Sequence, residues 1–238
     1  MITRDFFEYG SRLVSSTIQV DIINLDELSP GNSRYRFVAD KLLKGHYTDI
    51  TFPVAYKHDR GRKWEDMLDT GYPPLQLISN KMKTVLEENE LTGWKTYPIR
   101  IFKKRGEEIF GYHGFSVTGR SGPTRYDQAT IIEKPFYKGG EVHKHYKGLY
   151  IDLHEWDKTD FFIPAVRNCI LVTKKAAEAL QKYKFTNVEL INLADYTRDI
   201  CSLKSSAEDL KNAKEKDRAV FWQKVADKIR KDEAAGLI

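Results

Sequence analysis

The chain has 238 residues, of which 41% are apolar and 12% aromatic, so it can bury a sizeable core and is not intrinsically disordered. No apolar run approaches the roughly 20 residues of a membrane-spanning helix, and the N-terminus lacks the pattern of a secretory signal. Cys169 and Cys201 are too few for a disulfide framework. We therefore expect a cytoplasmic protein with two free, buried thiols, although a single disulfide between them is an alternative.

The net charge of +5 is concentrated in the middle of the chain. The segment from Ile99 to Tyr150 holds ten Lys or Arg and five Asp or Glu, which accounts for the whole excess. A basic surface in that segment would favour an acidic protein partner or nucleic acid, whereas a solvated sheet face is the simplest alternative.

In chain order, β-branched and aromatic residues predict short strands at 35–39 and 47–56 and a longer strand at 94–102. Between the last two, Ser79 is placed to cap a helix whose apolar face includes Met82, Val85 and Leu86. The glycine-rich middle predicts strands at 109–117 and 129–133, with a loop at 120–126.

A charged helix is predicted from Ser205 to the C-terminus, because Ser205 and Glu208 have the spacing of a capping box. Its apolar residues recur at multiples of four, at Ala213, Phe221, Val225 and Ile229. This narrow stripe favours a helix docked on the core, with a partner-binding helix as the alternative.

Two parts of the chain are similar in sequence at a constant offset of 94 residues, which indicates an internal repeat. The segment from Leu77 to Trp94 aligns without gaps to the segment from Leu171 to Val188. Each copy predicts a strand, a hydroxyl N-cap, a helix of about three turns, a small turn residue and a second strand. A real repeat would place two similar helices on one mixed sheet, although unrelated strand–helix–strand units can also look alike.

These elements predict an α+β fold in a single domain spanning residues 1–238. It would contain a mixed or antiparallel sheet, two similar strand–helix–strand units, and a docked C-terminal helix over residues 205–238.

Several short motifs resemble a known family. They are Asp66-Met-Leu-Asp69, Pro74-Leu-Gln-Leu-Ile-Ser79, Leu91-Thr-Gly-Trp94, Tyr97-Pro-Ile-Arg100, Asp160-Phe-Phe162 and Phe185-Thr-Asn-Val-Glu-Leu190. From about Trp64 to Leu193 the chain resembles the bacterial immunity-protein family numbered eleven among polymorphic-toxin systems, formerly a domain of unknown function. The resemblance implies a cytoplasmic antidote that neutralises a toxin by binding it, with no catalytic residues. The basic, glycine-rich segment 103–126 and the charged C-terminal helix depart from that family.

A metal site is the main chemical alternative. In a strand, Glu141, His143 and His145 would share one face, and His154 follows nine residues after His145. Histidines with this spacing can ligate zinc or iron in a metal-dependent enzyme. Lys144 and Lys147 would disfavour a bound cation, and solvated strand histidines explain the pattern better than a metal site, so we expect no metal and no cofactor.

Other catalytic signatures are missing from the sequence. There is no phosphate-binding glycine loop and no nucleophile elbow. Cys169 lies in an apolar stretch, where burial would keep its thiol protonated.

We therefore predict a non-enzymatic, protein-binding protein whose contact surface is the basic, tyrosine-rich segment 103–150. The alternatives are a metal-dependent enzyme and a nucleic-acid-binding module. Interface hot spots favour Tyr, Trp and Arg, so the predicted anchors are Arg120, Arg125, Tyr126, Tyr137 and Tyr146.

Overall fold

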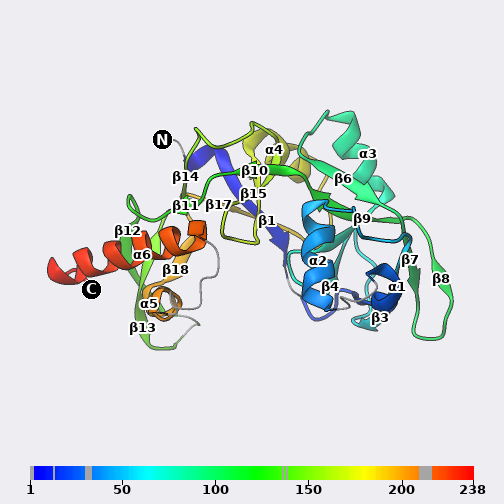
Figure 1. Cartoon of the computed structure of the whole chain (residues 1–238), viewed down its shortest axis with the longest axis horizontal. Coiled ribbons are helices and arrows are strands. Elements are labelled where there is room, and N and C mark those ends of the chain that lie inside the picture. Colours follow the sequence, from blue (N-terminus) through cyan, green and yellow to red (C-terminus); the bar gives the residue numbers. More distant parts are fainter. Residues whose placement is uncertain (1–2, 13, 30–33, 136, 138, 209–215) are drawn as a thin grey trace.

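The computed structural model describes residues 3–12, 14–29, 34–135, 137, 139–208 and 216–238. The chain has an α+β fold with several mixed sheets and a C-terminal helix, as predicted. An eight-stranded sheet lies at one end of the molecule, a five-stranded sheet in the middle, and a three-stranded sheet with two helices at the other end (Figure 1).

The largest sheet has the strand order β6-β9-β5-β4-β2-β3-β7-β8. Its strands are β2 (Gln19–Ile22), β3 (Val54–Arg60), β4 (Met67–Thr70), β5 (Gln76–Ser79), β6 (Trp94–Tyr97), β7 (Ile99–Phe102), β8 (Glu108–Ile109) and β9 (Tyr112–Val117). The predicted strand at 94–102 is thus two strands. Pro98 separates them, because proline cannot donate to a strand ladder, and β6 and β7 lie near opposite edges of the sheet.

The middle sheet has the order β10-β15-β16-β1-β17. Its strands are β1 (Phe6–Ser11), β10 (Gly119–Ser121), β15 (Phe161–Pro164), β16 (Ile170–Thr173) and β17 (Val188–Asn192). Two smaller ladders contain β11 (Thr124–Arg125) with β14 (Tyr150–Ile151), and β12 (Thr130–Pro135) with β13 (Val142–Lys147) and β18 (Thr197–Asp199). The loop predicted at 120–126 was wrong, because β10 and β11 there pair with the distant strands β15 and β14.

The helices are η1 (Thr3–Asp5, a 3-10 turn), α1 (Leu25–Leu28), α2 (Tyr35–Lys44), α3 (Asn80–Glu88), α4 (Lys174–Lys182), α5 (Ile200–Glu208) and α6 (Lys216–Ala234). The strand predicted at 35–39 is therefore wrong, and the one predicted at 47–56 overlaps only the start of β3. Val38, Ala39, Leu42 and Leu43 are fully buried and lie on one face of α2 at helical spacing, so burial of that face outweighs local β propensity.

The start predicted for the C-terminal helix was also wrong. Ser205 lies inside α5, where its hydroxyl donates to the carbonyl of Cys201, and α6 begins at Lys216. Ala213 lies outside the described residues. Among the residues that the structure describes, no helix combines the length and the apolar composition needed to cross a bilayer.

The predicted repeat is confirmed by its helices. The ranges of α3 and α4 are related by the same offset of 94 residues. Ser79 caps α3 by accepting from the N–H of Met82 at 3.2 Å, and Thr173 caps α4 by accepting from the N–H of Ala176 at 3.3 Å. The two copies therefore share both position and capping geometry.

The turns that follow the two helices also correspond. Glu90 and Lys184 both have φ of 49°, and Gly93 and Asn187 have φ of 82° and 60°. A Cβ on Gly93 would lie 2.1 Å from the carbonyl oxygen of Phe161, so only glycine fits there. Asparagine tolerates the left-handed conformation in the second copy.

The repeat extends further than the sequence indicates. In the large sheet β9 lies between β5 and β6, and β4 has the parallel neighbour β2. In the middle sheet β1 lies between β16 and β17, and β15 has the parallel neighbour β10. The first unit thus comprises β1, β2, β4, β5, α3 and β6, and the second comprises β9, β10, β15, β16, α4 and β17.

Each unit contributes its first strand to the sheet of the other unit. Strand β1 of the first unit is inserted between β16 and β17, and β9 of the second unit is inserted between β5 and β6. The expectation that both helices lie on one sheet was therefore wrong, because α3 packs on the large sheet and α4 on the middle sheet. The fold is a tandem duplication with exchanged strands.

A carboxylate clasp holds the second unit to the first. Asp160 accepts at Oδ1 from the hydroxyl of Thr173 at 2.7 Å, within its own unit. Its Oδ2 accepts from the N–H and hydroxyl of Thr92, in the first unit, at 3.0 and 3.1 Å. Lys175 lies 3.7 Å from the same oxygen.

An equivalent clasp lies 94 residues earlier. Asp66 accepts at Oδ1 from the hydroxyl of Ser79 at 3.1 Å, and at Oδ2 from the N–H and hydroxyl of Thr186 at 2.9 and 3.1 Å. Lys81 lies 3.5 Å from Oδ2. Each clasp joins an aspartate of one unit to a threonine of the other, so the two clasps are reciprocal.

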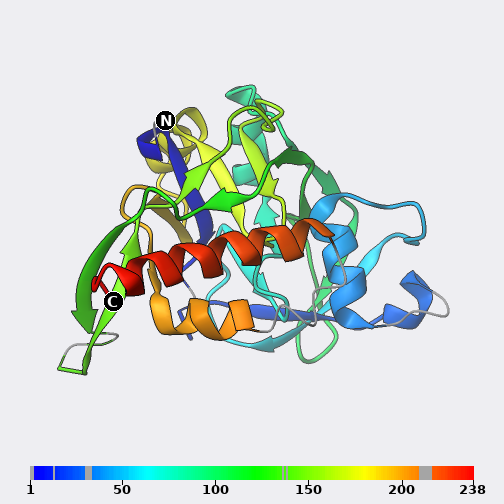
Figure 2. The same ribbon diagram turned by 60° about the vertical axis from the view of Figure 1, so that its left-hand side comes forward.

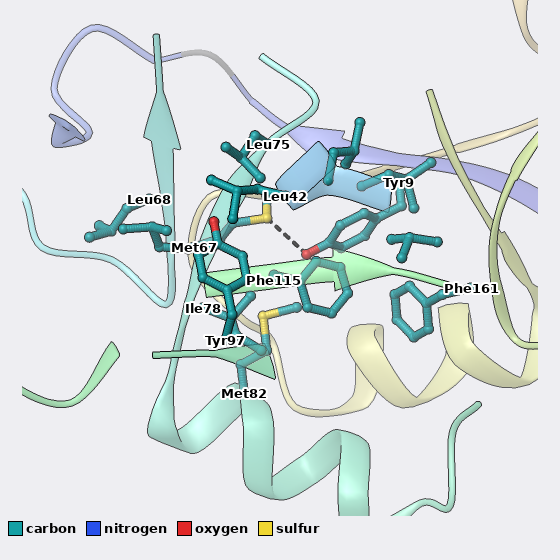
Figure 3. Close-up of a cluster of buried hydrophobic side chains, with 14 of the residues drawn as sticks. Tyr9, Leu42, Met67, Leu68, Leu75, Ile78, Met82, Tyr97, Phe115 and Phe161 are labelled. Carbon is teal, nitrogen blue, oxygen red and sulfur yellow. Dashed lines mark hydrogen bonds between the residues drawn. The ribbon is translucent and has the colours of Figure 1, made fainter. Parts of the chain in front are cut away.

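Aromatic side chains fill the junction of the two units. Tyr9 on β1 and Phe115 on β9 hold equivalent places in the two sheets, with ring centroids 6.1 Å apart, and both contact Phe161 (Figure 3). The hydroxyl of Tyr9 donates to Sδ of Met67 at 2.9 Å (Figure 3). This shared core makes the exchanged strands part of the packing of both units.

Candidate functional site

The five predicted anchor residues are divided between the interior and the surface. Arg125 and Tyr126 line one pocket, Arg120 and Tyr146 hold elements of the fold together, and Tyr137 is 73% exposed. The structure therefore brings only two of them to one site.

Arg120 is engaged inside the fold. Its guanidinium donates to the carbonyls of Val117 and Gly119 on its own segment, each at 2.7 Å, and to that of Lys44 at the end of α2, at 2.8 Å. Its backbone N–H donates to Asp157. Partial burial lowers the pKa of Arg120. These bonds attach β10 to α2 and leave Arg120 no role in an exposed contact surface.

Tyr146 docks α6 onto β13. Its side chain is fully buried, and its hydroxyl donates to Oδ2 of Asp232 at 2.6 Å. Burial, together with this carboxylate, raises the pKa of Tyr146. Lys228 completes the group, because its ammonium lies 2.6 Å from the same oxygen and 5.1 Å from the centre of the Tyr146 ring.

The apolar stripe of α6 is buried, as predicted for a docked helix. Phe221, Val225 and Ile229 are each 4% exposed and belong to a hydrophobic cluster that also contains Ile200 and Leu203 of α5. The red helix α6 crosses the molecule with α5 beside it, in orange (Figure 2). Both helices pack beside the three-stranded sheet.

Docking of α6 leaves a pocket of about 660 Å³ along one side of the helix. We call it the α6 groove. It is lined by residues 123–127, Asp152, Glu155 and Ala165, and from α6 by Val220, Phe221, Lys224, Val225, Asp227, Lys228 and Lys231.

The floor of the groove is apolar and its rim is charged. Tyr126 is 4% exposed, its ring centroid lies 5.9 Å from that of Tyr146, and burial raises its pKa to about 12. On the rim, Arg125 binds Asp127 through two hydrogen bonds of 3.0 and 2.7 Å and lies 3.6 Å from Asp152. The bond from Arg125 lowers the pKa of Asp127. Arg125 is thereby held at the mouth of the groove.

The three histidines of the alternative metal site do not all lie on one element. His143 and His145 are on β13, and His145 is buried, with Nδ1 hydrogen-bonded to the carbonyl of His143 at 3.0 Å. His154 is exposed in the segment after β14. Within the described ranges, no three His, Cys, Asp or Glu side chains form a group that could hold a metal ion.

The two cysteines differ in environment. Both are free thiols. Cys169 is partly buried and Cys201 is exposed, so the expectation of two buried thiols was wrong. Burial raises the pKa of Cys169 to about 11, so this thiol is protonated at neutral pH, as expected.

Sequence reasoning missed the contribution of α6 to the site. The signal was present, since Lys224, Lys228 and Lys231 have the i, i+4, i+7 spacing of one helical face. Their position opposite residues 123–127 depends on how α6 docks. A second pocket, of about 740 Å³, lies beside α4 and β17 and contains none of the predicted anchors.

Comparison with known proteins does not assign this chain to a family. No family model matches this sequence, and no curated protein matches it.

Proposed function

We propose that this chain is a cytoplasmic, non-enzymatic binding protein that neutralises a cognate bacterial toxin by direct contact, with the α6 groove as its contact surface. One support is the resemblance of residues 64–193 to an immunity-protein family. The other is the composition of the groove.

The observation that carries the proposal is the combination of an apolar floor, provided by Tyr126, Phe221 and Val225, with a charged rim that includes Arg125. Protein interfaces have an apolar centre and a polar rim, and their strongest contacts are enriched in Tyr and Arg. The groove also contains two of the anchors expected from sequence.

Co-expression with the toxin-like product of a neighbouring gene tests this function. We expect a complex that survives gel filtration, together with restored growth of cells that produce the toxin. The variant Asp49→Ala serves as a control for loss of a surface charge and should form the same complex as the wild type. The Asp49 side chain is 68% exposed and lies outside the groove. If no complex forms and toxicity is unchanged, the proposal is wrong.

A further inference from the structure

We infer that the α6 groove receives an amphipathic segment of the toxin that carries acidic side chains on one flank and basic side chains on the other. This inference rests on the proposed function and specifies the chemistry of the partner. It follows from the opposite charges of the two groove walls.

The wall formed by α6 is basic. Three lysines and one aspartate from this helix line the groove, a net charge of +2. Lys228 is committed to the buried Asp232. Lys224 and Lys231 are exposed and form no salt bridge with any described residue, although the charge of Lys224 acts across the groove and helps to lower the pKa of Asp127. Both ammonium groups can therefore pair with a partner.

The opposite wall is acidic. Asp127, Asp152 and Glu155 line it together with Arg125, a net charge of −2. The positive charge of Arg125 neutralises part of the negative charge of Asp127 and Asp152. Glu155 is exposed and forms no salt bridge with any residue that the structure describes. The two walls are thus charged oppositely across one apolar floor.

The floor between the two walls is apolar. Tyr126, Phe221 and Val225 line the groove and are each 4% exposed, so an occupant would meet apolar side chains between the charged flanks.

The charge pattern selects among possible partners. A nucleic-acid strand or a uniformly acidic peptide would meet repulsion from the wall that contains Glu155, and a uniformly basic peptide would meet repulsion from Lys224 and Lys231. A segment with apolar side chains between an acidic and a basic flank matches both walls and the floor.

Charge reversal of the α6 wall tests this inference. The variant Lys224→Glu/Lys231→Glu changes two exposed side chains and leaves the buried stripe of α6 intact. Its matched control is Arg62→Glu/Lys63→Glu, which makes the same charge change at two exposed positions between β3 and β4, outside both the groove and segment 103–150.

Affinity for the purified toxin is measured by calorimetry at two salt concentrations, after thermal unfolding has confirmed that both variants are folded. We expect the α6 variant to bind roughly 30-fold or more weakly at low salt, and the control to change by less than about threefold. Glu155→Lys, on the other wall, is expected to weaken binding as well.

The outcomes separate the inference from the proposed function. If wild-type chain binds the toxin and the α6 variant binds equally well, this inference is wrong and the proposed function stands. If the α6 variant is weakened but Glu155→Lys binds more tightly, the partner is uniformly acidic and the two-flank chemistry is refuted. Absence of any complex with the wild-type chain overturns both.

Discussion

Replacing Asp160 with alanine is expected to destabilise the fold strongly, because this carboxylate ties the second unit to the first. The change removes three hydrogen bonds, from Thr173 and from the backbone and side chain of Thr92. A hydrogen bond to a charged acceptor stabilises by roughly 1.5 kcal/mol or more, whereas an exposed salt bridge adds at most about 1 kcal/mol. Because Thr92 is exposed, water can replace part of its bonding. We expect a loss of roughly 3 kcal/mol.

The duplication provides an internal control for this prediction. Asp66→Ala removes the three equivalent bonds, and the side chains of Asp66 and Asp160 are similarly accessible, at 14% and 11%. Urea unfolding followed by circular dichroism should therefore give losses for the two variants that agree within about 1 kcal/mol. The exposed control Asp49→Ala should change stability by less than about 0.5 kcal/mol. Losses below about 1 kcal/mol for both clasp variants would refute the reasoning.

Three further predictions concern buried or exposed groups. Burial raises the pKa of Asp69 above its ordinary 3.8, so its ionisation lowers stability as pH rises through the folded-state value. Asp69→Asn should therefore unfold at higher urea than the wild type at pH 7, with the difference closing near pH 3; a lower midpoint at pH 7 would contradict this. Tyr146→Phe leaves Asp232 buried without its 2.6 Å donor and should cost roughly 1–3 kcal/mol in the same assay, whereas unchanged stability would argue against this contact. At pH 8 a thiol reagent should modify exposed Cys201 roughly a hundredfold faster than Cys169, since burial raises the pKa of Cys169 to about 11; equal rates would show that Cys169 is accessible.

The strand exchange has a consequence for how the chain folds. In the first unit β5 and β6 pair only with β9 of the second unit between them, and in the second unit β16 and β17 pair only with β1 of the first unit between them. Neither sheet can therefore close before both halves of the chain are present. The shared aromatic core and the two carboxylate clasps then couple the stability of one unit to that of the other.

Residue types alone suggested the anchors of the candidate site. Tyr and Arg are common at interfaces, which is why five such residues were predicted, and the structure places Arg125 and Tyr126 at one pocket. It places Arg120 and Tyr146 elsewhere, because a residue type does not reveal whether its polar group is already used inside the fold. Arg120 bonds backbone carbonyls, and Tyr146 bonds Asp232.

The sequence by itself determined the local features of this protein. Hydroxyl caps at Ser79 and Thr173 and apolar residues at helical spacing sufficed to identify α3 and α4, because these signals act within a few residues. The constant offset of 94 residues between matching residues identified the two helices as copies of one repeat. Only the tertiary structure decided that β1 and β9 change places and that α6 docks beside residues 123–127. Strand pairing and helix docking join residues far apart in the chain, and their free energy depends on surfaces that exist only once both partners are folded.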